Sequence, residues 1–150
     1  MKKILLALAC ALMVTACGGG GKDDPNGGGS GKINLSGEWQ LSKITTKATL
    51  GDETVNVYID FNDDKTFSLY QMLGTGRYRL HTGNWTLTGK SLSGSYSGGT
   101  AWSSTYEVTQ DNDNTLTLTS VSANASVTEV DTYTRTTIPE SVKSSVIANE

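Results

Sequence analysis

The sequence predicts an all-β protein: an antiparallel up-and-down barrel of about eight strands, followed by a short C-terminal helix. Apolar and polar residues alternate in short runs, most regularly from Val55 to Phe61, which indicates strands with one face in a core and one in water. Turn signals recur about every eight to twelve residues, the spacing of a sandwich or barrel. Short links between the runs favour a meander that closes on itself and leaves no exposed edge.

The first half of this pattern starts with an expected strand at 37–46, which holds Trp39. The clean alternation at 54–62 is followed by an acidic hairpin turn and a partner strand at 67–73. After the break at 74–76, strands are expected at 78–82 and 85–88, with a kink or turn at Gly83-Asn84 between them.

The second half continues with expected strands at 91–96, 101–109, 115–122 and 127–136, in which Thr, Tyr and Val dominate. A helix is then expected from Pro139 to Ala148. Proline suits a first helical position and Glu140 suits the positive helix N-terminus. Val142, Val146 and Ile147 are spaced to share one face of that helix.

The N-terminal segment reads as a secretory signal over residues 1–16. Lys2 and Lys3 precede an apolar run that is shorter than the ~20 residues of a membrane span. Val14-Thr15-Ala16-Cys17 resembles a bacterial lipoprotein signal, in which the cysteine is lipidated and becomes the first mature residue. Lipidation would also explain an unpaired Cys17, because Cys10 is lost with the leader. The alternative is ordinary cleavage that leaves a free thiol.

The expected organisation is therefore a signal at 1–16, a lipidated cysteine with a glycine-rich tether at 17–34, and a barrel domain at 35–150. The acidic run Lys22-Asp23-Asp24 resembles surface-export signals of some Gram-negative lineages. That resemblance implies an outer-membrane protein anchored on the cell surface, with the periplasmic face as the alternative. The run is otherwise a solvated charge trio in the linker.

The charge balance argues against one class of partner. The chain has 12 basic and 15 acidic residues, and removing Lys2 and Lys3 leaves 10 against 15, a net charge of −5. Nucleic acid binding needs clustered Lys and Arg, so no nucleic acid partner is expected.

The start of the domain carries a family resemblance. Leu35-Ser36-Gly37-Glu38-Trp39 looks like the Gly-x-Trp motif that opens the first strand of lipocalins, and the closer likeness is to bacterial lipocalin-like lipoproteins. The resemblance implies that Trp39 closes one barrel end and that Arg135, at the end of the last strand, lies across it. The Thr-Asp-Tyr motif of that family is absent from the loop at 110–114. We expect Trp39 and Arg135 to have a structural role and not a binding one.

No catalytic set, metal site or cofactor is expected, and we do not expect an enzyme. His81 is the only histidine, so a triad would depend on it alone. Asp60, Asn62 and Asp64 have the opening spacing of a calcium loop, but that loop requires glycine where Lys65 stands. A charged hairpin turn explains these residues better.

Aromatic side chains are the candidates for binding. Trp85, Trp102 and Tyr106 are expected to point inward, where they either fill the barrel or line a pocket for a small apolar or amphipathic ligand. The alternative is a surface module for glycan or protein, with outward Tyr58 and Tyr70 stacking on sugar rings. A hydrolase ranks last.

Overall fold

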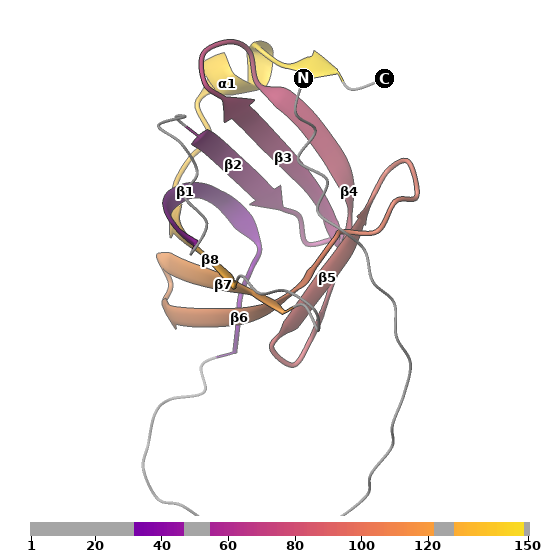
Figure 1. Ribbon diagram of the computed structural model, residues 1–150, viewed down its shortest axis with the longest axis vertical. Coiled ribbons are helices and arrows are strands. Elements are labelled where there is room, and N and C mark those ends of the chain that lie inside the picture. The colour runs from indigo at the N-terminus through magenta and orange to yellow at the C-terminus, as the bar shows by residue number, and fades with distance from the viewer. Residues whose placement is uncertain (1–31, 47–54, 122–127, 149–150) are drawn as a thin grey trace, which may run out of the picture.

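The computed structural model describes residues 32–46, 55–121 and 128–148 of the chain. The strands and helix follow in the order β1 Gly37–Thr46, β2 Val55–Phe61, β3 Thr66–Leu73, β4 Arg79–Thr88, β5 Ser91–Tyr96, β6 Thr105–Asn112, β7 Thr115–Val121, β8 Glu129–Arg135, α1 Glu140–Ser144 and β9 Ile147–Ala148 (Figure 1). The predicted signal, Cys17 and most of the tether lie outside the described residues.

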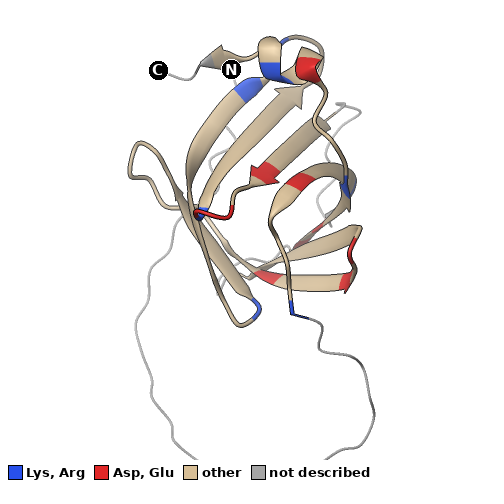
Figure 2. Ribbon diagram, turned by 180° about the vertical axis from the view of Figure 1, so that it is seen from behind, with Lys and Arg blue, Asp and Glu red and all other residues tan. Residues whose placement is uncertain are grey.

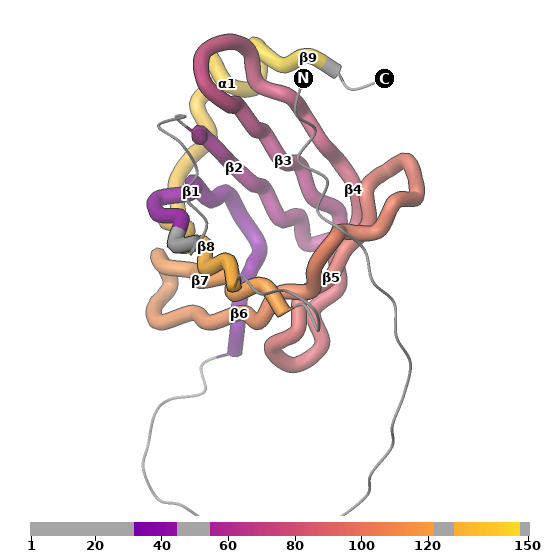
Figure 3. The backbone as a smooth tube through the Cα atoms, viewed as in Figure 1, coloured from indigo at the N-terminus to yellow at the C-terminus, as the bar shows by residue number. Residues whose placement is uncertain are grey.

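Eight of these strands form a closed antiparallel barrel, which confirms the predicted fold class. Each strand from β1 to β8 pairs with the next one along the chain, and β8 pairs back onto β1. Figure 3 shows the chain path running round this ring before it reaches α1 and β9 at one end. Closure gives every barrel strand two neighbours, so none of the eight is an open edge.

The predicted alternation decides what lies inside. Val57, Ile59 and Phe61 of β2 are buried, as are Leu116 and Leu118 of β7. The polar residues between them point outward, so each strand contributes one face to a shared core.

One end of the barrel is closed by Trp39, which is completely buried and donates its indole N–H to the Leu35 carbonyl at 2.7 Å. Its cross-strand partner is Arg135, whose guanidinium lies 4.1 Å from the ring centroid. Arg135 also donates to the carbonyls of Ser36 at 2.8 Å and Asp113 at 2.7 Å. Gly37 has a φ of +115°, and a Cβ there would lie 2.6 Å from Arg135 Nη1, so a larger residue would collide with the arginine.

The predicted break at Gly83-Asn84 is wrong, because β4 runs without interruption from Arg79 to Thr88. Gly83 pairs with Phe67 on one side and Tyr96 on the other. A Cβ on Gly83 would lie 2.0 Å from the Ser95 carbonyl oxygen. The glycine therefore serves the close approach of two strands, not a turn.

The predicted helix from Pro139 to Ala148 is also too long, since α1 spans Glu140–Ser144 only. The Ser144 hydroxyl donates to the Glu140 carbonyl, and Ser145 donates to that of Val142. Beyond this turn the chain is extended: Ile147 donates its N–H to the Tyr78 carbonyl, and β9 pairs in parallel with the start of β4. Main-chain pairing with an available strand replaces the helical bonds that so short a helix supplies weakly.

We predict that Gly83→Ala destabilises the barrel by about 2–3 kcal/mol, because the added methyl group meets backbone that cannot move away. Urea unfolding followed by circular dichroism measures this loss. Gly98→Ala is the matched control, since a Cβ there has no neighbour within 4 Å. Equal stability of the two variants would contradict the close approach at Gly83.

Candidate ligand-binding site

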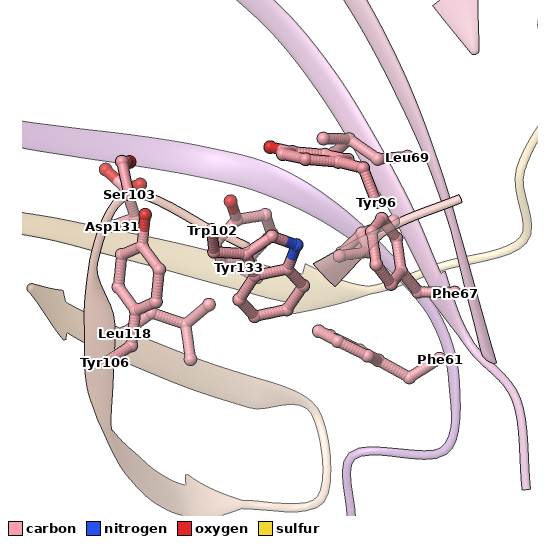
Figure 4. A pocket seen from close by; sticks show the side chains of 11 residues that line it. Phe61, Phe67, Leu69, Tyr96, Trp102, Ser103, Tyr106, Leu118, Asp131 and Tyr133 are labelled. Carbon is pink, nitrogen blue, oxygen red and sulfur yellow. The ribbon is translucent and has the colours of Figure 1, made fainter. Parts of the chain in front are cut away.

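A pocket of about 90 Å³ lies inside the barrel. Side chains of β2, β3, β5, β6, β7 and β8 and of the segment before β6 line it: Ile59, Phe61, Phe67, Leu69, Tyr96, Trp102, Ser103, Tyr106, Leu118, Asp131 and Tyr133. Figure 4 shows two chemically different ends, with Ser103 and Asp131 at one and Phe61, Phe67 and Leu69 at the other. The pocket is therefore mostly apolar with a polar end.

The volume sets the scale of what the pocket holds in this conformation. An apolar cavity that admits benzene measures about 150 Å³. The 90 Å³ here encloses a slender group, such as a short alkyl chain, more readily than a ring system.

Trp102 reaches the pocket through an irregularity between β5 and β6. Ser95 forms a β-bridge with Ala101, whereas Leu92 pairs with Tyr106. The three residue steps from Leu92 to Ser95 therefore lie opposite five residue steps from Ala101 to Tyr106. The predicted strand at 101–109 is therefore wrong at its start, because β6 begins only at Thr105. Bulges of this kind re-aim side chains.

A glycine supports the position of Trp102. The backbone N–H of Trp102 donates to the Gly94 carbonyl at 2.8 Å. The Trp102 ring covers Gly94 so closely that a Cβ added to the glycine would lie 2.6 Å from ring carbon Cε2. The ring also stands edge-on to Phe67 at 5.1 Å and to Tyr106 at 6.2 Å between centroids.

Of the three aromatic residues predicted to bind a ligand, the structure brings Trp102 and Tyr106 together in the pocket. Trp85 lies elsewhere in the core: its indole N–H donates to the Thr66 carbonyl at 3.0 Å, and the Lys65 ammonium sits 4.0 Å over its ring. A role for any of the three in binding stays a prediction.

Asp131 is the pocket residue that sequence reasoning missed. It lies on β8 opposite Ile44 of β1 and Leu118 of β7. Its Oδ1 atom is buried and has no hydrogen-bond partner among the described residues. The sequence does contain a signal for Asp131. Arg135 lies over Trp39 and therefore faces inward, and every second residue of a strand shares one face, so Tyr133 and Asp131 face inward as well.

Burial and the neighbouring Glu129 raise the pKa of the Asp131 carboxyl to about 7. Burial likewise raises the pKa values of the Tyr106 and Tyr133 phenols. Each shift has the same physical cause, because a low-dielectric interior disfavours the charged form of an acid.

The outward tyrosines considered for glycan stacking are half-buried. Tyr58 and Tyr70 are cross-strand partners on β2 and β3. Tyr58 also lies 6.0 Å from the ring of Tyr78, and burial raises the pKa of Tyr70. Their use on sugars stays a prediction.

α1 and the segment before it are joined to β1 through Glu38. Lys143 donates to Glu38 at 2.7 Å, and the other Glu38 oxygen accepts the Ile138 N–H at 2.8 Å. Figure 2 shows the remaining Lys and Arg of the described chain at separate places on the ribbon, not in one stripe.

The structure also bears on a histidine-based site, a metal site and a membrane-spanning helix, none of which the sequence favoured. The His81 ring lies 5.8 Å from that of Tyr96, and burial lowers its pKa. Within residues 32–46, 55–121 and 128–148, no three His, Cys, Asp or Glu side chains gather to hold a metal ion. In the same part of the chain, no helix has the length and apolar character to cross a membrane.

A closed eight-stranded up-and-down barrel belongs to the class of β-barrels whose interior is either filled by side chains or wide enough for one small ligand. The family model described as lipocalin-like domain matches residues 35–118, more than half of the chain, and the protein is a member of that family. No curated protein and no solved structure gives a significant match. The matched region runs from Leu35, two residues before the Gly-x-Trp motif, into β7, and β8 completes the barrel.

Asp131 should make stability depend on pH. Because its folded pKa is raised to about 7, the stability it contributes is present below the unfolded value of about 4 and is lost as the pH rises through 7. We predict that Asp131→Asn is more stable than the parent by about 2 kcal/mol above pH 8, after allowance for partial exposure.

Urea unfolding at pH 4 and pH 8.5 measures this difference, which should shrink toward zero at the lower pH. Glu107→Gln removes the same charge from an exposed position on β6 and serves as the control. A stability gain of Asp131→Asn that is identical at both pH values would contradict the assignment.

Proposed function

We propose that this protein is a lipid-anchored binding protein of the cell envelope whose barrel takes up a small apolar or amphipathic molecule. The supporting observation is the internal pocket, which combines a mostly aromatic and aliphatic lining with a single carboxyl group. Apolar walls with a few placed polar groups are the usual composition of sites for small molecules. The lipocalin-like family membership supports the same use of the barrel interior.

Different residues of the lining would set the affinity for a ligand and the orientation of the ligand. Phe67, Leu69 and Trp102 offer apolar surface, and burying a ligand chain against them gains roughly 25 cal/mol for each Å² removed from water. Ser103 and Asp131 at the other end would fix which end of the ligand enters first. No chemical step is part of the proposal, and binding is expected to leave the ligand unchanged.

We predict that 1-hexanol binds the pocket and shifts the NMR signal of one indole N–H, that of Trp102. The other two tryptophans are internal controls, because Trp39 and Trp85 donate to backbone carbonyls and do not line the pocket. Titration of the full chain with 1-hexanol tests this. Movement of all three signals together, or of none, would count against binding at this pocket.

A pair of neighbouring variants sharpens that titration. Ser103→Phe places a ring in the lining and should weaken hexanol affinity at least about tenfold, the equivalent of 1.4 kcal/mol. Ser104→Phe adds the same ring at the next residue, which is not part of the lining, and should leave the affinity unchanged.

The anchor is the second part of the proposal. Cys17 lies outside the described residues, and the support for its lipidation is the leader and the Val14-Thr15-Ala16-Cys17 pattern. A diacylglyceryl group on its sulfur would hold the barrel at a membrane through a glycine-rich tether. The acidic run at Lys22-Asp23-Asp24 supports placement on the outer surface, with the periplasmic side as the alternative.

We predict that the mature protein starts at Cys17 and carries a lipid on its sulfur, as intact-mass spectrometry of membrane-extracted protein would show. Cys17→Ala should move the protein from the membrane fraction to the soluble fraction or block its processing. A free thiol at Cys17 in the exported protein would rule out the anchor.

A further inference from the structure

The uptake of a purely apolar molecule leaves the carboxyl group of Asp131 unexplained. Its Oδ1 atom is buried beside the pocket without a donor among the described residues. Almost all buried polar atoms in folded proteins have a partner, and an exception at a cavity wall points to a partner from outside the chain, such as a water, an ion or a ligand group. A ligand that enters the pocket is in position to supply that group.

The surroundings of Asp131 favour positive charge. Glu129 precedes it by two residues on β8, and its negative charge raises the pKa of Asp131 further. Directly opposite stand the uncharged Ile44 on β1 and Leu118 on β7. The other titratable residues of the pocket are phenols of β5, β6 and β8: Tyr96, Tyr106 and Tyr133.

No lysine, arginine or histidine is present among the lining residues of the described chain. A ligand carboxylate would therefore meet Asp131 and Glu129 without a compensating cation. Aromatic rings such as those of Trp102 and Tyr106, by contrast, attract a cation over their faces, and a low-dielectric site strengthens that attraction.

We propose that the pocket binds a small primary amine, whose ammonium group donates to Asp131 while its carbon chain lies between Trp102 and the Phe61–Phe67 end. This inference rests on the proposed function and names the chemical class of its ligand. The ammonium supplies a donor to Oδ1, which has none among the residues that the structure describes, and the apolar end of the pocket accepts the carbon chain.

The volume restricts the shape of the amine. A pocket of about 90 Å³ is smaller than the ~150 Å³ apolar cavity that admits benzene. An unbranched alkyl amine therefore fits better than a branched or polycyclic one.

The test compares three probes with the same carbon chain: 1-hexylamine, 1-hexanol and hexanoate. Each is titrated into the full chain at pH 8.5, where an alkyl amine is still protonated and Asp131 is ionised. The Trp102 indole signal reports occupancy. The expected order is hexylamine at least about tenfold tighter than hexanol, and hexanoate weakest.

Two further measurements tie this preference to Asp131. Asp131→Asn should bring the ratio of amine to alcohol affinity close to one, whereas Glu107→Gln on the outside of β6 should leave the ratio unchanged. In the unaltered protein, lowering the pH from 8.5 to 5.5 neutralises Asp131 and should reduce the amine preference about tenfold.

The outcomes separate the two proposals. If hexanol binds but hexylamine is no tighter, or if Asp131→Asn keeps the amine preference, the amine assignment is wrong while the proposed binding function stands. If none of the three probes moves the Trp102 signal, both are wrong.

Discussion

The pairing of β8 with β1 is the interaction on which the remaining structure depends, because it turns a row of strands into a barrel with an inside. It joins residues from opposite ends of the domain, and Trp39 opposite Arg135 is its first pair. Arg135 reinforces this seam by bonding carbonyls of the segment before β1 and of the β6–β7 turn. Without closure, the inward faces would lie on an open sheet and neither core nor pocket would exist.

Closure gives the interior two ends of different character. At the Trp39 end, the indole N–H and the guanidinium both have partners, so polar atoms are satisfied and the space is filled. Toward the other end, an oxygen of Asp131 has no hydrogen-bond partner within the described part of the chain and lies beside an unfilled volume. The first arrangement stabilises the fold, whereas the second reduces stability at neutral pH and is understandable as part of a binding site.

The β5–β6 seam links the pocket to its surroundings. β5 and β6 share only the pairs Ser91–Glu107 and Leu92–Tyr106, after which the bulge at Ser103 and Ser104 separates the two chains. Trp102 and Ser103 enter the pocket from that irregular segment, while Phe67, Leu118 and Tyr133 stand on regular strands. The site thus combines walls from regularly paired strands with one side that does not belong to the ladder.

Sequence alone predicted a barrel of about eight strands and the inward faces of β2 and β7, because period-two alternation and turn residues act over short distances. The Trp39–Arg135 pair was expected from the resemblance to lipocalins, since no local pattern joins residues so far apart in the chain. It did not determine the continuity of β4, since Gly83 looks like a break until Phe67 and Ser95 are seen to crowd it. Helix α1 ended early for a similar reason: the start of β4 offered Ile147 a backbone partner that local spacing does not reveal. Only the tertiary structure separated Trp85 from Trp102 and set Asp131 beside an apolar cavity, because ring closure and a bulge decide which inward residues meet.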